Sequence, residues 1–119
     1  MTAVATGTML EDVAIEFLQK NGLLILHRNF RCKTGEIDLI AKDYNYLVFV
    51  EVRYRANGLH GSAAESVNIA KQQKIIRSAQ FYIQTRNWAQ KVNCRFDVVA
   101  MSGAHESPNI DWIKDAFDE

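Results

Sequence analysis

The chain has 119 residues, of which 48% are hydrophobic and 24% charged, a profile that excludes a disordered chain and leaves room for one modest core. No stretch approaches the roughly 18 consecutive apolar residues of a membrane span, and the first residues lack the pattern of an export signal. We therefore expect one cytoplasmic domain over residues 1–119, without a membrane partner, with a flexible tail over residues 1–7 and two free thiols, Cys32 and Cys94.

The charges are distributed unevenly, although 14 basic and 14 acidic residues give a net charge of zero. Residues 53–91 contain seven Lys or Arg and a single acid, whereas residues 97–119 contain six acids and a single Lys. Because phosphates respond to local charge, the basic middle of the chain is consistent with a nucleic-acid-binding surface. It is also consistent with a helix face that its charges keep in solution, and the charge pattern alone does not decide.

The first predicted element is a helix that begins at Thr8, since apolar residues recur every three or four positions as far as Leu18. The pair Asn21-Gly22 provides a typical helix end. Three predicted strands follow, over residues 23–32, 36–41 and 46–54. The third is apolar on both faces, which is typical of a central strand covered on each side.

A Gly- and Ala-rich loop that contains His60 separates these strands from the second half of the chain. The elements expected after it are a helix over residues 68–85, a strand over 95–101 and a short strand over 110–113. Three consecutive strands predict a meander, and the long helix predicts a crossover connection. The predicted fold class is therefore α/β, a mixed central sheet of four to five strands flanked by helices, in the order α-β-β-β-α-β-(β).

Acidic and basic residues interrupt the apolar strands at facing positions. Strand alternation places Glu36 and Asp38 on one side of the second strand. It places Glu51, Arg53 and Arg55 on one side of the third. Asp38 and Glu51 are 13 positions apart with a turn midway, so we expect them to face each other across an antiparallel pair. Burying such acids costs several kcal/mol unless they are paired or metal-bound, and facing acids repel.

A divalent cation between the two acids would relieve both costs, and Mg²⁺ or Mn²⁺ suits carboxylate, carbonyl and water oxygens. The expected ligands are Asp38, Glu51 and the backbone carbonyl of Val52. Glu36 is either an extra ligand or a solvated residue. Arg53 would hold a phosphate or stabilise the transition state, while the ion activates a water. The alternative is a surface salt bridge from Arg53 to one of these acids at a sheet edge, and spacing alone leaves both interpretations open.

Several stretches resemble the YraN-like family of small bacterial proteins. They are RNFR at 28–31, GEIDLIA at 35–41, VFVEVR at 48–53, the helix with Lys71 and Lys74, and RFDVV at 95–99. That family is similar to the PD-(D/E)XK nuclease superfamily, particularly the archaeal Holliday-junction resolvases. The resemblance implies a restriction-endonuclease-like fold and a metal-dependent nuclease that hydrolyses DNA, more than RNA, with branched junctions as expected substrates. It implies a homodimer by analogy alone.

On this resemblance, Glu11 matches the superfamily's helix acid, Asp38 and Glu51 its metal-binding acids, and Arg53 its basic residue. The superfamily usually has Lys at that last position, and a guanidinium, unlike an amine, effectively cannot lose its proton. Arg53 therefore orients and stabilises but accepts protons poorly, which puts turnover in doubt. The alternative function is a catalytically weak or inactive nucleic-acid-binding or adaptor module. A smaller departure is Ile37, where the superfamily has Pro.

Other charged residues have two interpretations each. Glu11 either points at the site or closes a capping box by reaching back to the Thr8 amide. Three further basic residues recur at three-residue steps on the second helix: Lys71, Lys74 and Arg77. With Arg55 they predict contacts to a phosphate backbone, and the equal alternative for the helix residues is a solvated face.

Overall fold

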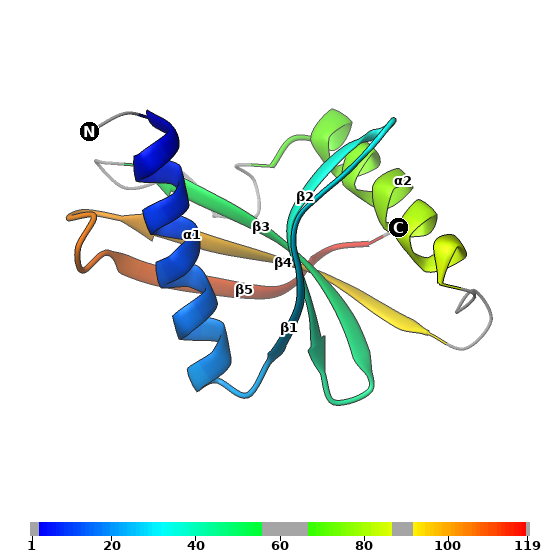
Figure 1. Ribbon diagram of the computed structural model, residues 1–119, viewed down its shortest axis with the longest axis horizontal. Helices are drawn as coiled ribbons and strands as arrows, with labels where there is room; N and C mark the ends of the chain where they lie inside the picture. The colour runs from blue at the N-terminus through cyan, green and yellow to red at the C-terminus, as the bar shows by residue number, and fades with distance from the viewer. Residues whose placement is uncertain (1–2, 56–66, 87–91, 119) are drawn as a thin grey trace.

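The computed structural model describes residues 3–55, 67–86 and 92–118 of the chain (Figure 1). Its elements are α1 (Ala3–Lys20), β1 (Leu24–Cys32), β2 (Gly35–Asp43), β3 (Tyr46–Arg55), α2 (Ile69–Thr85), β4 (Asn93–Ser102) and β5 (Asn109–Phe117). The predicted class and element order are confirmed. The expected loop around His60 lies outside the described residues.

All five strands form one mixed sheet in the order β1-β2-β3-β4-β5. The first three strands pair antiparallel, as the predicted meander requires, and β4 pairs antiparallel with β5. β3 and β4 run parallel, because α2 carries the chain back to the start of the sheet between them. β3 is therefore the central strand, as its apolar sequence predicts.

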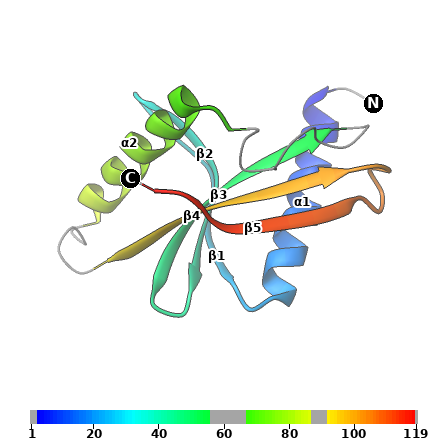
Figure 2. The same cartoon turned by 180° about the vertical axis from the view of Figure 1, so that it is seen from behind.

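The two helices cover different faces of this strongly twisted sheet. In Figure 1, α1 crosses in front of β4 and β5, and in Figure 2, seen from behind, those strands cross in front of α1. Alternate β3 residues supply the two cores: Phe49 packs in the cluster that contains Tyr82 of α2, and Val48 in the cluster that contains Leu18 of α1. Both faces of β3 are thus buried along its middle, so a charged side chain there, that of Glu51, lies in the interior.

Two predicted boundaries are wrong by more than two residues. The first helix begins at Ala3 instead of Thr8, and Ala3 and Ala5, which are strong helix formers, favour this extension. The last strand runs from Asn109 to Phe117 instead of ending at residue 113. It continues past a register shift opposite β4, where Asp115 takes a left-handed backbone conformation with φ of 54°. A local irregularity of this kind has no clear signature in the alternation of apolar residues.

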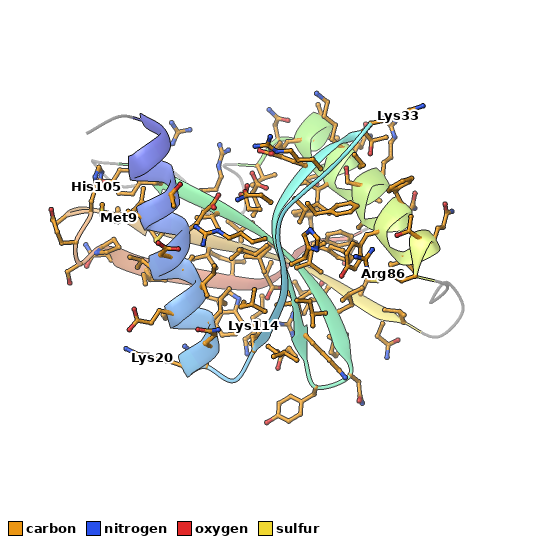
Figure 3. The ribbon with its side chains drawn as sticks, in the orientation of Figure 1. Met9, Lys20, Lys33, Arg86, His105 and Lys114 are labelled. Atoms are coloured by element: carbon orange, nitrogen blue, oxygen red, sulfur yellow. The ribbon has the colours of Figure 1, made fainter. Side chains whose placement is uncertain are left out.

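Within the described ranges, neither helix is long and apolar enough to cross a membrane. Cys32 and Cys94 are both free, as predicted. Cys32 ends β1, and its Sγ lies 3.2 Å from Thr34 Oγ1. Lys33 follows it at the tip of the β1–β2 hairpin, which extends alongside α2 (Figure 3).

Candidate functional site

Asp38 and Glu51 lie where β2 and β3 stop pairing. The ladder between these strands runs from Asp43↔Tyr46 to Leu39↔Val50, and continuing it by one residue sets Asp38 opposite Glu51. The Asp38 side chain reaches across the gap instead, and its Oδ2 accepts a hydrogen bond of 2.8 Å from the backbone N–H of Val52. The Asp38 carboxylate thus accepts a hydrogen bond of the kind that a backbone carbonyl accepts within the ladder. This bond fixes the carboxylate against β3.

β2 changes face at Asp38. Strict alternation would put Ile37 and Leu39 on one side, yet Ile37 packs in the α2 core and Leu39 in the α1 core. The neighbouring strand is distorted at the same level, since Asn29 of β1 has a φ of 55° between the pairs Arg28↔Leu39 and Phe30↔Ile37. The expectation that β2 alternates regularly from Glu36 through Asp38 is therefore wrong. The sheet bends at its acidic residue.

The buried setting perturbs both acids. Burial, assisted by the charge of Asp38, raises the pKa of Glu51 to about 7, although Lys71 and Arg53 act to lower it. Burial also raises the pKa of Asp38, against the effect of the Val52 N–H, and the charges of other acids add to the rise. The Glu51 side chain is only 5% exposed. The free-energy cost predicted for two acids facing each other in an apolar sheet is thus present. Lys71, Arg53 and the Val52 N–H offset only part of it.

Lys71, in the first turn of α2, meets this pair directly. Its Nζ lies 3.4 Å from Oε1 of Glu51, while its side chain is 40% exposed. The sequence led us to expect Lys71 at a phosphate or in solvent, and its contact with a buried acid was missed. No spacing rule would have revealed it, because residues 56–66 separate α2 from β3 and fix no distance between them.

Arg53 follows Glu51 by two residues on β3, and its charge opposes the burial-driven rise in the pKa of Glu51. The location that the alternative assumed, at the surface of a sheet edge, is wrong, because β3 is the central strand and Glu51 is buried. Arg55 is exposed at the end of the same strand. The strand therefore leads from a buried acid, past a half-buried guanidinium, to a basic residue in solvent.

Glu11 of α1 is tied to β1 and lies close enough to affect the site. Its Oε1 accepts hydrogen bonds of 3.2 Å from Arg28 Nε and from Asn29 Nδ2. The capping-box interpretation is wrong, since Thr8 lies inside α1 and its carbonyl accepts a bond from Arg28 Nη2. The charge of Glu11 adds to the burial-driven rise in the pKa of Asp38. Arg28 and Asn29 thus hold a third acid beside the pair, a role their sequence did not predict.

The remaining predicted residues are more exposed than the two acids. Glu36 is half exposed and pairs with Arg31 of β1, its Oε2 lying 3.0 Å from Arg31 Nε. Lys74 and Arg77 are exposed on α2. In the described part of the chain, no three Asp, Glu, His or Cys residues gather as a ready set of metal ligands. Asp38 and Glu51, with the Val52 carbonyl, are the groups that could hold a hard cation, and Glu11 and Glu36 do not join them in one set.

The fold and this site define a small α/β protein whose mixed sheet carries a half-buried and a buried acid on two neighbouring strands, β2 and β3. The chain belongs to the family described as "Uncharacterised protein family UPF0102", whose sequence model matches residues 10–101. The YraN-like resemblance is thus confirmed.

Similar proteins from several bacteria carry the name "UPF0102 protein". The chain is 46% identical over 111 residues to one from Nitrosococcus oceani, which covers 93% of this chain and 90% of the relative. It is 42% identical over 114 residues to one from Stutzerimonas stutzeri, with 96% and 95% covered. It is 43% identical over 113 residues to one from Clostridium botulinum, with 93% and 92% covered. The likeness extends over nearly the whole chain in each case.

Proposed function

We propose that this protein is a divalent-metal-dependent nuclease of the PD-(D/E)XK type that hydrolyses phosphodiester bonds in DNA, with branched junctions as its preferred substrates. The observation that carries the proposal is the placement of half-buried Asp38 and buried Glu51 on neighbouring strands, at the point where β2 and β3 stop pairing. Such a pair is expensive to keep for stability alone. Perturbed acids of this kind are typical of sites that bind cations or move protons.

The donor set fits Mg²⁺ or Mn²⁺. These ions are commonly held by one or two carboxylates and complete their shell with water, so a third acid is not required. Asp38 already has Oδ2 engaged by the Val52 N–H, which presents the rest of its carboxylate in a fixed orientation. A bound ion would neutralise charge on the phosphate and activate a water for attack.

The chain's own residues would divide the remaining work. Arg53 would bind a nonbridging phosphate oxygen, because a guanidinium donates in a planar fork and keeps its charge. Glu11 would repel a second anion from the α1 side of Asp38 and so restrict where the phosphate sits. The exposed residues Arg55, Lys74 and Arg77 would contact neighbouring phosphates of the nucleic acid.

The test is cleavage of labelled four-way junctions, flaps, duplexes and single strands by purified protein in Mn²⁺. We expect cleavage of at least one branched substrate, and a loss of roughly a hundredfold or more in Asp38→Asn and in Glu51→Gln. Asp111→Asn, which changes an exposed acid of β5, is the matched control and should cleave normally. Cleavage that persists in both site variants would come from another enzyme and would overturn the proposal.

A second function is favoured by one feature, the presence of Arg53 at the position where the nuclease superfamily usually has Lys. Without a group there that can release a proton, the same fold would serve as a nucleic-acid-binding or adaptor module with little turnover. Arg53→Lys separates the two proposals. A gain of cleavage favours a weakened nuclease, whereas unchanged DNA binding without cleavage favours the adaptor.

A homodimer and a cytoplasmic location remain predictions. Sedimentation would test the first, and cell fractionation would test the second.

A further inference from the structure

Lys71 is anchored by its backbone and directed at the site by its side chain. Asn68 caps α2, and its Oδ1 accepts a hydrogen bond of 2.9 Å from the Lys71 N–H. The same turn is tied down by Gln72, whose Nε2 donates to the Val67 carbonyl at 2.8 Å. Because the start of α2 is fixed in this way, the ammonium of Lys71 moves only by rotation of its own four-carbon stem.

The contact that Lys71 makes has the features of an exchangeable ion pair. Its Nζ lies 3.4 Å from Glu51 Oε1, longer than the roughly 2.7–2.9 Å of a strong charge-assisted hydrogen bond. One partner is buried and the other is 40% exposed, so the ammonium can return to water while the carboxylate cannot. The exposed end of the pair therefore has an alternative partner available, and the buried end needs a cation from elsewhere if Lys71 leaves.

We propose that Lys71 is a built-in counter-cation of Glu51 that a divalent cation displaces, and that the released ammonium then binds a phosphate of the nucleic acid. This proposal rests on the proposed function. It makes metal binding and phosphate binding support each other: the ion frees Lys71 for the phosphate, and a phosphate that holds Lys71 away leaves Glu51 to the ion. Linkage requires that this coupling be the same in both directions.

Lys71 could compete with the divalent cation for Glu51, or it could only stabilise the charge of Glu51. These two roles predict opposite effects of removing Lys71 on metal binding. If Lys71 only keeps Glu51 charged and in place, its loss should weaken metal binding. If Lys71 occupies the position of the ion, its loss should strengthen metal binding wherever protons do not compete for Glu51. Measurements at about pH 8.5, far above the ordinary pKa of a carboxylic acid, limit that competition.

The experiment is calorimetric titration of Mn²⁺ in oxygen-free buffer at about pH 8.5 into wild type, Lys71→Ala and Lys71→Gln. We expect both variants to bind Mn²⁺ about fivefold more tightly, the size of a half-exposed ion pair. The matched control is Lys33→Ala, which removes the same charge from the exposed tip of the β1–β2 hairpin and should stay within about twofold of wild type. Thermal unfolding of each variant verifies that it is folded, and Lys71→Gln serves if Lys71→Ala does not fold.

A second measurement follows the released ammonium. Binding of a junction DNA by wild type should strengthen when Mn²⁺ is added, and this gain should be smaller in Lys71→Gln than in Lys33→Ala. Equal or weaker Mn²⁺ binding in the Lys71 variants, still dependent on Asp38, would overturn the displacement of Lys71 and leave the proposed function intact. Absence of Asp38-dependent Mn²⁺ binding in wild type would overturn the proposed function itself and this inference with it.

Discussion

Asp97 and Glu51 are buried carboxylates on adjacent strands, and the protein surrounds them in opposite ways. Asp97 of β4 is fully buried and accepts four hydrogen bonds of 2.9–3.0 Å, two from the Arg95 guanidinium, one from Trp112 Nε1 and one from the Asp115 N–H. Glu51 of β3 is nearly as buried but meets a lysine at 3.4 Å and a second acid.

The difference is between an acid whose charge is fully hydrogen-bonded and an acid whose charge is only partly compensated. The donors around Asp97 come from β4 and β5, and Arg95 also reaches Asp43 at the end of β2, so this cluster joins three strands. Charge-assisted bonds of this number can repay the burial of an ion. The surroundings of Glu51 leave its pKa raised, which means that part of the cost of burial remains. An acid kept at such a cost is available for another cation.

The largest expected effect is on the structural acid. Asp97→Asn should lower the free energy of unfolding by about 3 kcal/mol or more, because the Arg95 guanidinium loses one of its two charged partners in the interior. Urea unfolding followed by circular dichroism measures this change, with Asp111→Asn on the exposed side of β5 as the control. A loss below about 1 kcal/mol would mean that the Asp97 cluster does not organise the strands.

Glu51→Gln should have the opposite sign and stabilise the protein by about 2 kcal/mol above pH 7. The pKa of Glu51 rises from an ordinary value of 4.5 to about 7 on folding, so the folded state holds the proton more tightly. Wild-type stability should therefore fall as pH rises from about 4.5 to 7 and then level off. Unfolding curves across this range should converge for the two proteins near pH 4. If Glu51→Gln were less stable than wild type at every pH, the charged form of Glu51 would not destabilise the folded protein, and this account of Glu51 would be contradicted.

A smaller effect concerns the bend in the sheet. Asn29 has a φ of 55°, which Asn and Gly tolerate better than other residues. Asn29→Ala should therefore be less stable than Asn29→Gly by about 1 kcal/mol, although alanine keeps a Cβ. Both variants lose the bond to Glu11, so the difference between them reports backbone conformation alone. Equal stabilities would show that β1 can relax to a regular strand beside Asp38.

The smallest effect is expected at Glu36, whose half-exposed carboxylate pairs with exposed Arg31. Glu36→Gln should change the free energy of unfolding by less than about 0.5 kcal/mol, as is usual for surface ion pairs. It should also leave Mn²⁺ affinity within about twofold of wild type. A clear loss of Mn²⁺ binding would mean that Glu36 is a further ligand of the ion.

The sequence predicted those features that depend on neighbours along the chain. The hairpin between β2 and β3 is nearly symmetric about its turn, so the spacing of Asp38 and Glu51 was enough to place them on facing strands. The apolar run of β3 was enough to identify it as central. Local order, turn position and side-chain period determine these features without knowledge of the tertiary structure.

Contacts between distant segments were not predicted, for physical reasons. Lys71 reaches Glu51 only because α2 packs on a particular level of the sheet. Glu11 fits a capping box locally, but Arg28 and Asn29 compete for its carboxylate once β1 lies beside α1. Tertiary contacts of this kind override local preferences and leave no periodic trace in the sequence.

The central claim is that Asp38 and Glu51 bind a single divalent cation together. Calorimetric titration of Mn²⁺ into wild type, Asp38→Asn, Glu51→Gln and Asp111→Asn tests it without requiring the natural substrate. We predict one saturable site in wild type and in Asp111→Asn, and its loss in each of the two site variants. Unchanged binding in Asp38→Asn or in Glu51→Gln would contradict the account, because the cation would then be held elsewhere on the protein.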